Sequence, residues 1–455
     1  MITTTTSGRV RGRQDNGIAV FKGIPYAQPP QGELRFQLPV PPSPWDGIRD
    51  CTEFASAAPQ LPAAPGVPPI WQPADGLDCL TLNVWTPDLA GRSPVMVWIH
   101  GGLWKLGGTR MPQYEATTLA RSGVVVVTVN YRVGFEGFGH LPDTPDNRGL
   151  RDQIAALDWV RANIASFGGD PANVTAFGQS AGAASVALLT ATGLFHRAIA
   201  QSIPAGIRTQ AEAAAVTTTI AAAAGVQPTR DALAALPPEA ILQVQDMPLR
   251  GRDAGLTAFA PVIDGDLVTG PTITANPDVD LVCGYTHDEY LNQGPPLPPD
   301  VDLAVVAQAI GLTPQAADDY RRAYPDADLV TTMLSDALVR VPTLEVAEAH
   351  AAAGGRTWLY DLAWPGPAGH GVDVPLVFGD PGTRFAARVL GTPTPPGFDD
   401  LSARIRRAWT GFAASGDPGW PAYDVADRRT RIWDVPVRDV PDPLAASRRI
   451  RFRAE

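Results

Sequence analysis

The strongest constraint on the fold is a series of short apolar runs, each bounded by turn residues. They are PVMVWIH (94–100), VVVVTVNYR (124–132), NVTAFG (173–178), RAIAQS (197–202), DLVCGY (280–285) and TWLYDLAW (357–364). Strands that are apolar on both faces belong at the centre of a mostly parallel sheet, because helices cover both sides of such a sheet. The runs therefore predict an α/β fold with a large, mostly parallel central sheet flanked by helices.

The segment 147–171, between two of these runs, has the pattern of a helix. Its apolar residues recur at spacings of three and four: Ile154, Leu157, Val160, Ile164 and Phe167. The sequence GGDP follows and ends the predicted helix. A strand, a helix and a strand in this order predict a crossover unit.

The rest of the chain indicates one domain with additions. Residues 1–90 are rich in proline and carry the weaker strand patterns RVRG, IAVFKGIPYA and LTLNVWTP, so we expect a small N-terminal antiparallel portion. Residues 206–256 and 299–355 are rich in alanine, and we interpret them as cap-like helical insertions. The tract NQGPPLPPDVD (292–302) is interpreted as a surface loop rather than a linker. We therefore expect a single domain over residues 1–455.

Charge and composition exclude several classes of function. The net charge of −11 and the pI near 5.1 oppose binding to nucleic acid. No apolar run reaches the roughly eighteen residues of a membrane span. The N-terminal sequence MITTTTSGRVRG has neither the charged leader nor the apolar core of a signal peptide, so we expect a cytoplasmic protein. Cys51, Cys79 and Cys283 are too few and too scattered for a disulfide framework or a zinc cluster, and we expect buried free thiols.

A candidate nucleophile stands in FGQSAGAAS (177–185), where Ser180 lies between two glycines directly after an apolar, β-branched run. The pattern G-x-S-x-G between a strand and a helix is typical of a nucleophilic serine at a sharp turn, but it also occurs in ordinary glycine-rich turns. A nucleophilic serine needs a base, an acid that orients the base, and donors for the oxyanion. The other parts of the chain must supply these groups.

The candidate base lies downstream of Ser180, because in this architecture the acid and then the histidine follow the serine. His287, His350 and His370 are downstream. His350 lies in EVAEAHAAAGG, which we interpret as the surface of a helix. His370 lies in the glycine- and proline-rich loop WPGPAGHGVD after a predicted strand, and it is the best candidate, with a merely solvated side chain as the alternative.

The candidate acids lie between the serine and the base. Asp288 and Glu289 are in the turn after the predicted strand 280–285, and local reasoning does not choose between them. Asp264 and Asp266, in PVIDGDLV, are also available, and their alternative role is to form a turn.

The oxyanion donors are predicted in WIHGGLWKLGG (98–108), where a His-Gly-Gly turn follows a strand. Glycine lets the backbone approach a ligand and direct N–H groups at it. The N–H of Ala181, after the serine, would add another donor. The two motifs together predict a serine hydrolase.

At this point the sequence resembles the type-B carboxylesterases, the carboxylesterase/cholinesterase family with the α/β-hydrolase fold, as a bacterial-type member. The resemblance covers most of the chain, including GIPYAQPPQGELRF, DCLTLNVWTP, VWIHGG, FAASGDPGWPAYD and the specific run 147–182. It implies Ser180 as nucleophile, Glu289 as acid and His370 as base. The implied oxyanion donors are the N–H groups of Gly102, Leu103 and Ala181, and the candidate substrate-pocket residues are Gly101 and Trp104.

The sequence departs from the family pattern at several positions. Gln179 and Asp373 stand where the family has glutamate, and Tyr290 stands where it has glycine. Leu103 replaces a glycine or alanine, which puts the pocket shape in doubt, although we expect that this turn needs no positive φ. Ala58 stands where many secreted members carry the cysteine that pairs with the position of Cys79, which agrees with a reducing compartment.

The resemblance implies hydrolysis of small to medium carboxylic esters through an acyl-enzyme, with no metal or cofactor. The same site would support cleavage of carbamates, amides or lactones, or acyl transfer to another acceptor. A third possibility is a non-catalytic binding protein of the same fold, but such relatives usually lack a triad residue and this chain has all three. The expected partner is a small-molecule ester, and the sequence leaves monomer and dimer open.

Overall fold

The computed structural model of the chain describes residues 1–64, 66–246, 258–291, 301–364 and 368–451. Contacts within the chain divide it into two compact units. The first unit comprises Met1–Arg197 and Gly206–Ile273, and the second comprises Ala198–Ala205 and Thr274–Glu455. A single domain over residues 1–455 remains a prediction.

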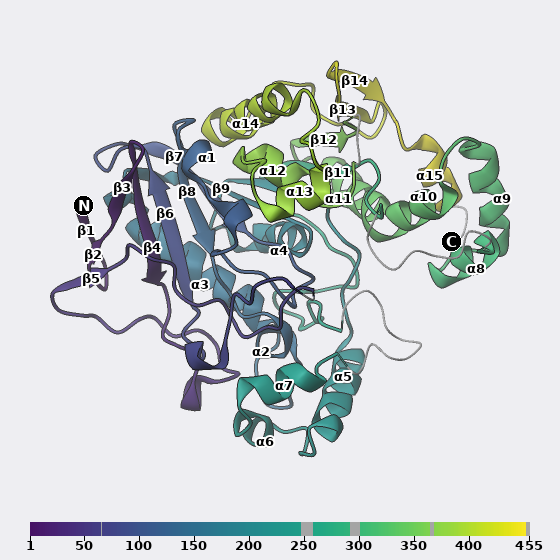
Figure 1. Ribbon diagram of the computed structural model, residues 1–455. Coiled ribbons are helices and arrows are strands. Elements are labelled where there is room, and N and C mark those ends of the chain that lie inside the picture. Colours follow the sequence, from purple (N-terminus) through teal and green to yellow (C-terminus); the bar gives the residue numbers. More distant parts are fainter. Residues whose placement is uncertain (65, 247–257, 292–300, 365–367, 452–455) are drawn as a thin grey trace. The chain divides into compact units, whose positions relative to one another are not determined.

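The strands of the first unit confirm the predicted parallel centre and antiparallel N-terminal portion. They lie side by side in the order β9, β7, β8, β6, β4, β3 (Figure 1). β7 is parallel to β8 and β9, whereas β8–β6, β6–β4 and β4–β3 are antiparallel pairs. β1, β2 and β5 form a separate small sheet. The bounds are β1 (Ile2–Thr5), β2 (Gly8–Arg11), β3 (Arg13–Asp15), β4 (Ile18–Pro25), β5 (Ile48–Asp50), β6 (Thr81–Thr86), β7 (Ser93–Ile99), β8 (Val125–Val129) and β9 (Gly169–Gln179).

The helices of the first unit include the predicted crossover between β8 and β9. α3 ends at Asn163, and a 3₁₀ turn (Ile164–Phe167) carries the last two apolar positions of the predicted pattern. The insertion predicted at 206–256 contains α5, α6 and α7, and its residues 247–256 lie outside the described part of the chain. The bounds are α1 (Thr117–Ala120), α2 (Gly134–Phe138), α3 (Arg148–Asn163), α4 (Ala181–Leu189), α5 (Gln210–Ala223), α6 (Arg230–Ala234) and α7 (Pro238–Val244).

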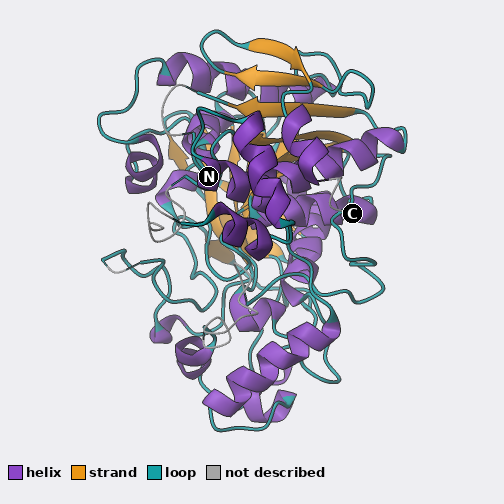
Figure 2. Ribbon diagram, turned by 90° about the vertical axis from the view of Figure 1, so that its right-hand side faces the viewer, coloured by secondary structure: helices purple, strands orange, loops and turns teal. Residues whose placement is uncertain are grey.

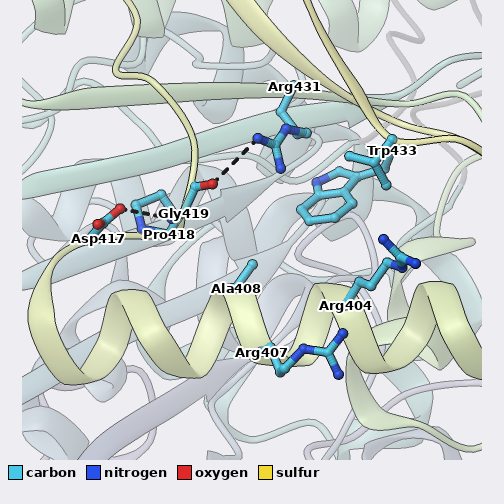
Figure 3. A pocket seen from close by; sticks show the side chains of 9 residues that line it. Arg404, Arg407, Ala408, Asp417, Pro418, Gly419, Arg431 and Trp433 are labelled. Carbon is cyan, nitrogen blue, oxygen red and sulfur yellow. Dashed lines mark hydrogen bonds between the residues drawn. The ribbon is translucent and has the colours of Figure 1, made fainter.

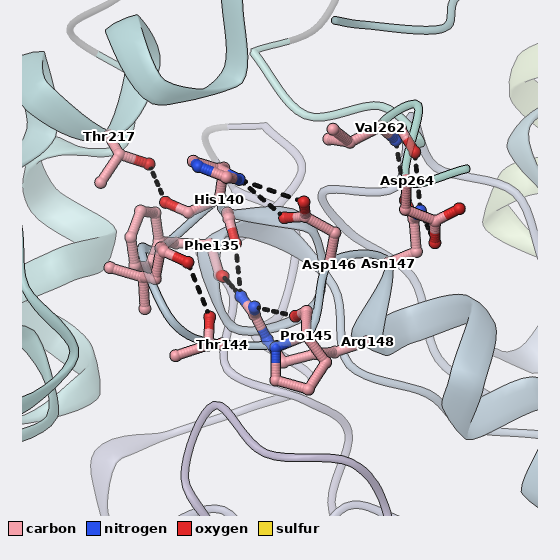
Figure 4. A network of polar contacts seen from close by, with 12 residues as sticks. Phe135, His140, Thr144, Pro145, Asp146, Asn147, Arg148, Thr217, Val262 and Asp264 are labelled. Carbon is pink, nitrogen blue, oxygen red and sulfur yellow. Dashed lines mark hydrogen bonds and ion pairs between the residues drawn. The ribbon is translucent and has the colours of Figure 1, made fainter. Parts of the chain in front are cut away.

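A buried arginine joins α2 to α3 (Figure 4). The side chain of Arg148, at the start of α3, donates hydrogen bonds to the carbonyls of Phe135, Glu136 and Gly139, and to that of Pro145. The last carbonyls of a helix have no partner inside it, so Arg148 satisfies those at the end of α2. Burial lowers the pKa of Arg148 to about 10, and the guanidinium stays charged at neutral pH.

The strands of the second unit follow the order β14, β13, β12, β11, β10. β12 is parallel to both β11 and β13, and β13 pairs antiparallel with β14. α11 packs against β11 and β12, and α12 packs against α14 (Figure 1). Figure 2 shows the helices in purple and the strands in orange. The strands are β10 (Arg197–Gln201), β11 (Asp280–Thr286), β12 (Thr357–Leu362), β13 (Arg429–Trp433) and β14 (Arg438–Pro441). The helices are α8 (Leu303–Ala309), α9 (Pro314–Ala323), α10 (Leu329–Ser335), α11 (Val341–Ala352), α12 (Asp373–Phe378), α13 (Arg384–Leu390), α14 (Phe398–Ser415) and α15 (Ala445–Arg451).

The structure also tests the predicted helices of 299–355 and the predicted state of the cysteines. The helices predicted in 299–355 are present as α8 to α11, whereas most of the tract 292–302 lies outside the described residues. Cys51, Cys79 and Cys283 are free and buried, as predicted. Across the described ranges, no helix is long and apolar enough to cross a membrane.

Candidate active site

Ser180 stands at a sharp turn between β9 and α4. Its φ of 57° and ψ of −126° lie outside the regions that residues with side chains favour. Glycines on either side permit the close packing of this turn on β7. A Cβ at Gly182 would lie 2.0 Å from the carbonyl oxygen of Ile99, and one at Gly178 would lie 2.7 Å from the same atom. Close contact with β7 therefore requires both glycines of the G-x-S-x-G pattern.

The His-Gly-Gly turn lies directly beside Ser180. A Cβ at Gly101 would be 2.6 Å from the carbonyl oxygen of Gln179 and 3.0 Å from the Cβ of Ser180. Gly102 has a φ of 123°, and a Cβ there would be 2.1 Å from the carbonyl oxygen of Leu106. The predicted nucleophile and the predicted oxyanion turn are thus neighbours within the first unit.

The conformation of Leu103 corrects one expectation. Leu103 and Trp104 have φ values of 58° and 53°, so the turn does require a positive φ. The physical reason is a tight closure, in which the carbonyl of Gly102 accepts hydrogen bonds from the amides of Lys105 and Leu106, both at 3.0 Å. Leu103 is partly exposed, whereas Trp104 is buried and donates its indole N–H to Ser185 Oγ at 3.2 Å.

Ala181, the third predicted oxyanion donor, is the first residue of α4. An N–H in the first turn of a helix has no carbonyl four residues earlier in that helix to bind. The N-terminal end of a helix also carries partial positive charge, which favours a developing anion. The backbone at Ala181 is therefore suited to an oxyanion.

Buried polar groups that the sequence analysis missed hold the oxyanion turn. His100 Nδ1 lies 2.8 Å from the carbonyl oxygen of Gly101, and the ring stacks on Tyr131 with centroids 4.4 Å apart. Burial lowers the pKa of His100 to about 4, so the ring is neutral. Because a carbonyl only accepts hydrogen bonds, the contact with Gly101 assigns the ring proton to Nδ1. The amide of Gln60 binds both the N–H and the carbonyl of Gly107, at 2.7 and 2.8 Å. Gln60 lies in the proline-rich N-terminal segment, where no motif marks it.

The second unit brings Glu289 and His370 together. Glu289 Oε2 lies 2.5 Å from His370 Nδ1, and Oε1 accepts the N–H of Thr286 at 2.8 Å. Burial would lower the pKa of His370, but the charge of Glu289 and this hydrogen bond outweigh it and raise the pKa. Because the carboxylate binds Nδ1, the ring nitrogen suited to exchange a proton with a substrate or nucleophile is Nε2.

The neighbouring residue, Asp288, is fixed through its backbone. It is half-buried, and its N–H donates to the carbonyl of Ala368 at 2.9 Å. Asp264 has the turn-forming role given as its alternative, because its Oδ1 accepts the amides of Asp266, Leu267 and Val268 at 2.9 to 3.1 Å. Among these candidates, Glu289 is the one at His370.

The other downstream histidines have partners of their own. His287 pairs with Asp361 at 2.9 Å, and its side chain is 49% exposed. His350 is on a helix as predicted, but the expected surface position is wrong because only 1% of it is exposed. Its ring lies between Thr357 Oγ1, at 2.7 Å, and the carbonyl of Val279, at 3.1 Å, so it links α11 to β12 and to the residue before β11.

A second buried carboxylate accompanies the Glu289–His370 pair. Asp373 accepts a hydrogen bond from Gln201 Nε2 at 2.6 Å, and Gln201 Oε1 accepts the indole N–H of Trp409 at 3.1 Å. Burial raises the pKa of Asp373 to about 6. Gln201 lies in the predicted strand RAIAQS, but nothing in the sequence marked its side chain as a partner of Asp373, 172 positions later.

A hollow of about 330 Å³ in the second unit contains none of the predicted site residues (Figure 3). Its lining includes Arg404, Arg431 and Trp433. Arg404 pairs with Asp400 and Arg431 with Asp439, so their charges are compensated. In the part of the chain that the structure describes, no group of three or more His, Cys, Asp or Glu side chains is placed to hold a metal ion.

Comparisons with known proteins agree with this geometry. The sequence model of the Carboxylesterase family matches residues 1–305. The chain is 35% identical to para-nitrobenzyl esterase of Bacillus subtilis (strain 168), covering 99% of this chain and 98% of that protein. It is 34% identical to Phenmedipham hydrolase of Pseudarthrobacter oxydans, covering 94% and 93%. A solved structure described as a thermophilic PNB esterase has 33% identity and a TM-score of 0.86 over 99% of both chains.

The chain therefore belongs to the carboxylesterase family and has the α/β-hydrolase fold. It is a carboxylic ester hydrolase.

Proposed function

We propose that the chain hydrolyses small to medium carboxylic esters through a Ser180–Glu289–His370 triad and an acyl-enzyme intermediate. The observation that carries this proposal is the strained Ser180 beside the glycine-rich oxyanion turn. A side chain held in an unfavourable backbone conformation is frequent at active sites, where the surrounding structure maintains it. The Glu289–His370 pair supports the proposal by supplying an oriented base.

The proposed reaction follows from the chemistry of these groups. His370 Nε2 accepts the hydroxyl proton as Ser180 Oγ attacks the ester carbonyl, and Glu289 stabilises the imidazolium. The N–H groups of Gly102, Leu103 and Ala181 bind the tetrahedral oxyanion. The alcohol takes the proton and leaves, and water, activated by His370, then releases the acid.

Relatives suggest which substrates to test first. One relative is named a para-nitrobenzyl esterase and another a Phenmedipham hydrolase, so we propose para-nitrobenzyl esters as substrates and phenmedipham as a second compound. A panel of p-nitrophenyl esters of increasing chain length, run beside aryl carbamates and amides, would define the acyl preference and the bond type. Gly101 and Trp104 remain candidate pocket residues, and Trp104 would act from a buried position.

The decisive test replaces the nucleophile. Ser180→Ala should lower turnover by about four to six orders of magnitude without unfolding the protein. An organophosphate should label Ser180 and no other serine, as peptide mass analysis would show. His370→Gln should be similarly inactive, whereas His287→Gln, which changes the other histidine–carboxylate pair, should retain most activity. Near-normal turnover of the alanine variant, or labelling elsewhere, would overturn the assignment.

We also propose a cytoplasmic location and a single domain with cap-like insertions at 206–256 and 299–355. The buried free thiols suit a reducing compartment. Cell fractionation tests the location, and limited proteolysis, which should leave no stable fragment of either unit, tests the domain organisation.

A further inference from the structure

A helical segment outside the proposed triad holds the acid loop, which we define as residues 287–291. Arg340 Nη1 donates a hydrogen bond to the carbonyl of His287 at 2.9 Å. Ser335 Oγ accepts the N–H of Tyr290 at 2.9 Å. A π-helical turn (Asp336–Arg340) lies between α10 and α11. Arg340 is the last residue of this turn, and Ser335 is the last residue of α10, directly before it. The loop that carries Glu289 is thus bound at two points, on either side of Glu289.

The carbonyl of Leu338 in the π-helical turn has a partner outside the helix. Pro342, near the start of α11, has no N–H to donate to the carbonyl of Leu338 four residues earlier. That carbonyl instead accepts the N–H of Ala205 at 2.9 Å. Single π turns in helices are rare and occur frequently at functional sites. This turn is therefore anchored both to the acid loop and to the residues that follow β10.

A buried ion pair sets the direction of the Arg340 side chain. Asp336 Oδ1 lies 2.8 Å from Arg340 Nε and 2.7 Å from Nη2, and the two side chains are 0% and 4% exposed. The hydroxyl of Tyr320 donates to Asp336 Oδ2 at 2.9 Å. A buried ion pair adds little net stability compared with an apolar pair of similar volume. Its geometric effect is clear, because a guanidinium held through Nε and Nη2 presents Nη1 to the acid loop.

We propose that Arg340 is a positioning residue that, through the acid loop, keeps the carboxylate of Glu289 on His370. The inference rests on the proposed function, because it assigns Arg340 to the acid of that triad. Glu289 Oε2 makes the short contact with His370 Nδ1, and the carbonyl of Glu289 accepts the N–H of His370 at 3.3 Å. The other carboxylate oxygen, Oε1, is held by the amide of Thr286, next to the acid loop. A shift of the loop therefore moves the carboxylate away from the base.

The dependence of kcat/KM on pH shows whether Glu289 is in place beside His370. The charges of Glu289 and Asp373 raise the pKa of His370, and that of Arg388 on α13 lowers it. If Glu289 moves away, the pKa of His370 falls. Since the base acts as the neutral imidazole, the acidic limb of the kcat/KM profile then moves to lower pH.

The main variant replaces the ion pair by apolar residues, Asp336→Leu with Arg340→Met, so that no buried charge is left unpaired. We expect kcat per active site for p-nitrophenyl acetate to fall about tenfold or more with little change in KM, since the loss affects the transition state rather than binding. We expect the midpoint of the acidic limb to fall by about half a pH unit or more. Titration of active sites with an organophosphate corrects for any unfolded fraction.

Two single variants keep the test decisive. Ser335→Ala removes the other anchor of the acid loop and should lower the midpoint in the same direction. Tyr320→Phe removes only the outer bond to Asp336, and its profile should match that of the wild type. If the double variant does not fold, Ser335→Ala decides alone. An unmoved midpoint and unchanged kcat per active site in the folded variants would overturn the proposal, whereas an active His370→Gln variant would instead refute the triad itself.

Discussion

Leu103 provides a direct test of how the oxyanion turn shapes the pocket. Its φ of 58° is in the left-handed region, which costs a residue with a side chain about 1–2 kcal/mol. Its side chain is partly exposed, so shortening it opens space beside the turn without creating a closed core cavity. Leu103→Ala and Leu103→Gly both remove the isobutyl group, but only the glycine variant also removes the strain.

The positive φ of Leu103 sets the expected sign of the stability difference between the two variants, and general magnitudes set its size. Glycine gains the 1–2 kcal/mol of strain relief but makes the unfolded chain more flexible, which costs about 0.4–1 kcal/mol relative to alanine. Leu103→Gly should therefore be more stable than Leu103→Ala, by about 0.8 kcal/mol at the centre of a range of about 0–1.6 kcal/mol. Thermal unfolding of the two variants, measured side by side, gives this ranking.

Kinetics with n-butyl acetate and tert-butyl acetate test the pocket. We expect the wild type to hydrolyse the tertiary ester poorly, because in the proposed site the isobutyl group would take the space that the branched alcohol needs. Both variants should raise the tert-butyl to n-butyl ratio of kcat/KM by about tenfold, which is a typical effect of a small change in an apolar pocket. An unchanged ratio would show that Leu103 does not shape the pocket. A glycine variant less stable than the alanine variant would refute the strain argument.

Three further predictions concern the triad and the serine turn. Glu289→Gln should lower turnover by orders of magnitude and Asp288→Asn should not, and the reverse ranking in steady-state assays would reassign the acid. Because Glu289 raises the pKa of His370 and the neutral base is the active form, kcat/KM should rise with pH around a midpoint above the ordinary histidine value of about 6.5. Gly182→Ala would place a Cβ 2.0 Å from a β7 carbonyl oxygen and should inactivate the enzyme, whereas Gly270→Ala, with open space around it, should not.

The strands that the sequence indicated most clearly are those buried on both faces. β7, β8 and β11 are nearly continuous apolar runs, which leave little choice of structure. β13 and β14 were missed because arginines interrupt their apolar residues, and both lie at one end of the strand order, where such side chains reach solvent. Their pairing therefore depends on neighbours far away in the sequence rather than on local composition.

The choice between Asp288 and Glu289 shows a second limit of sequence reasoning. Adjacent residues in a turn point in different directions, and which of them meets a histidine 81 positions later depends on how the turn is anchored. Here the amide of Thr286 holds one oxygen of Glu289, and Arg340 and Ser335 bind the loop on either side of it. None of these anchors belongs to a motif, so local reasoning left the choice open.

The conformations of Ser180 and Leu103 were the hardest to predict, for a physical reason. Local propensity argues against a positive φ at either residue, since neither is glycine. The cost is accepted because the tertiary structure overrides it: Ser180 is forced by the contact of its flanking glycines with β7, and Leu103 by the closure of the turn on the carbonyl of Gly102. Rules based on local sequence are expected to fail where the fold stores strain, and such places are often functional sites. The sharp turn predicted at Ser180 is present, whereas the positive φ of Leu103 was not expected. Both residues lie in one small region of the first unit, and this local strain supports the proposal that the region carries out catalysis.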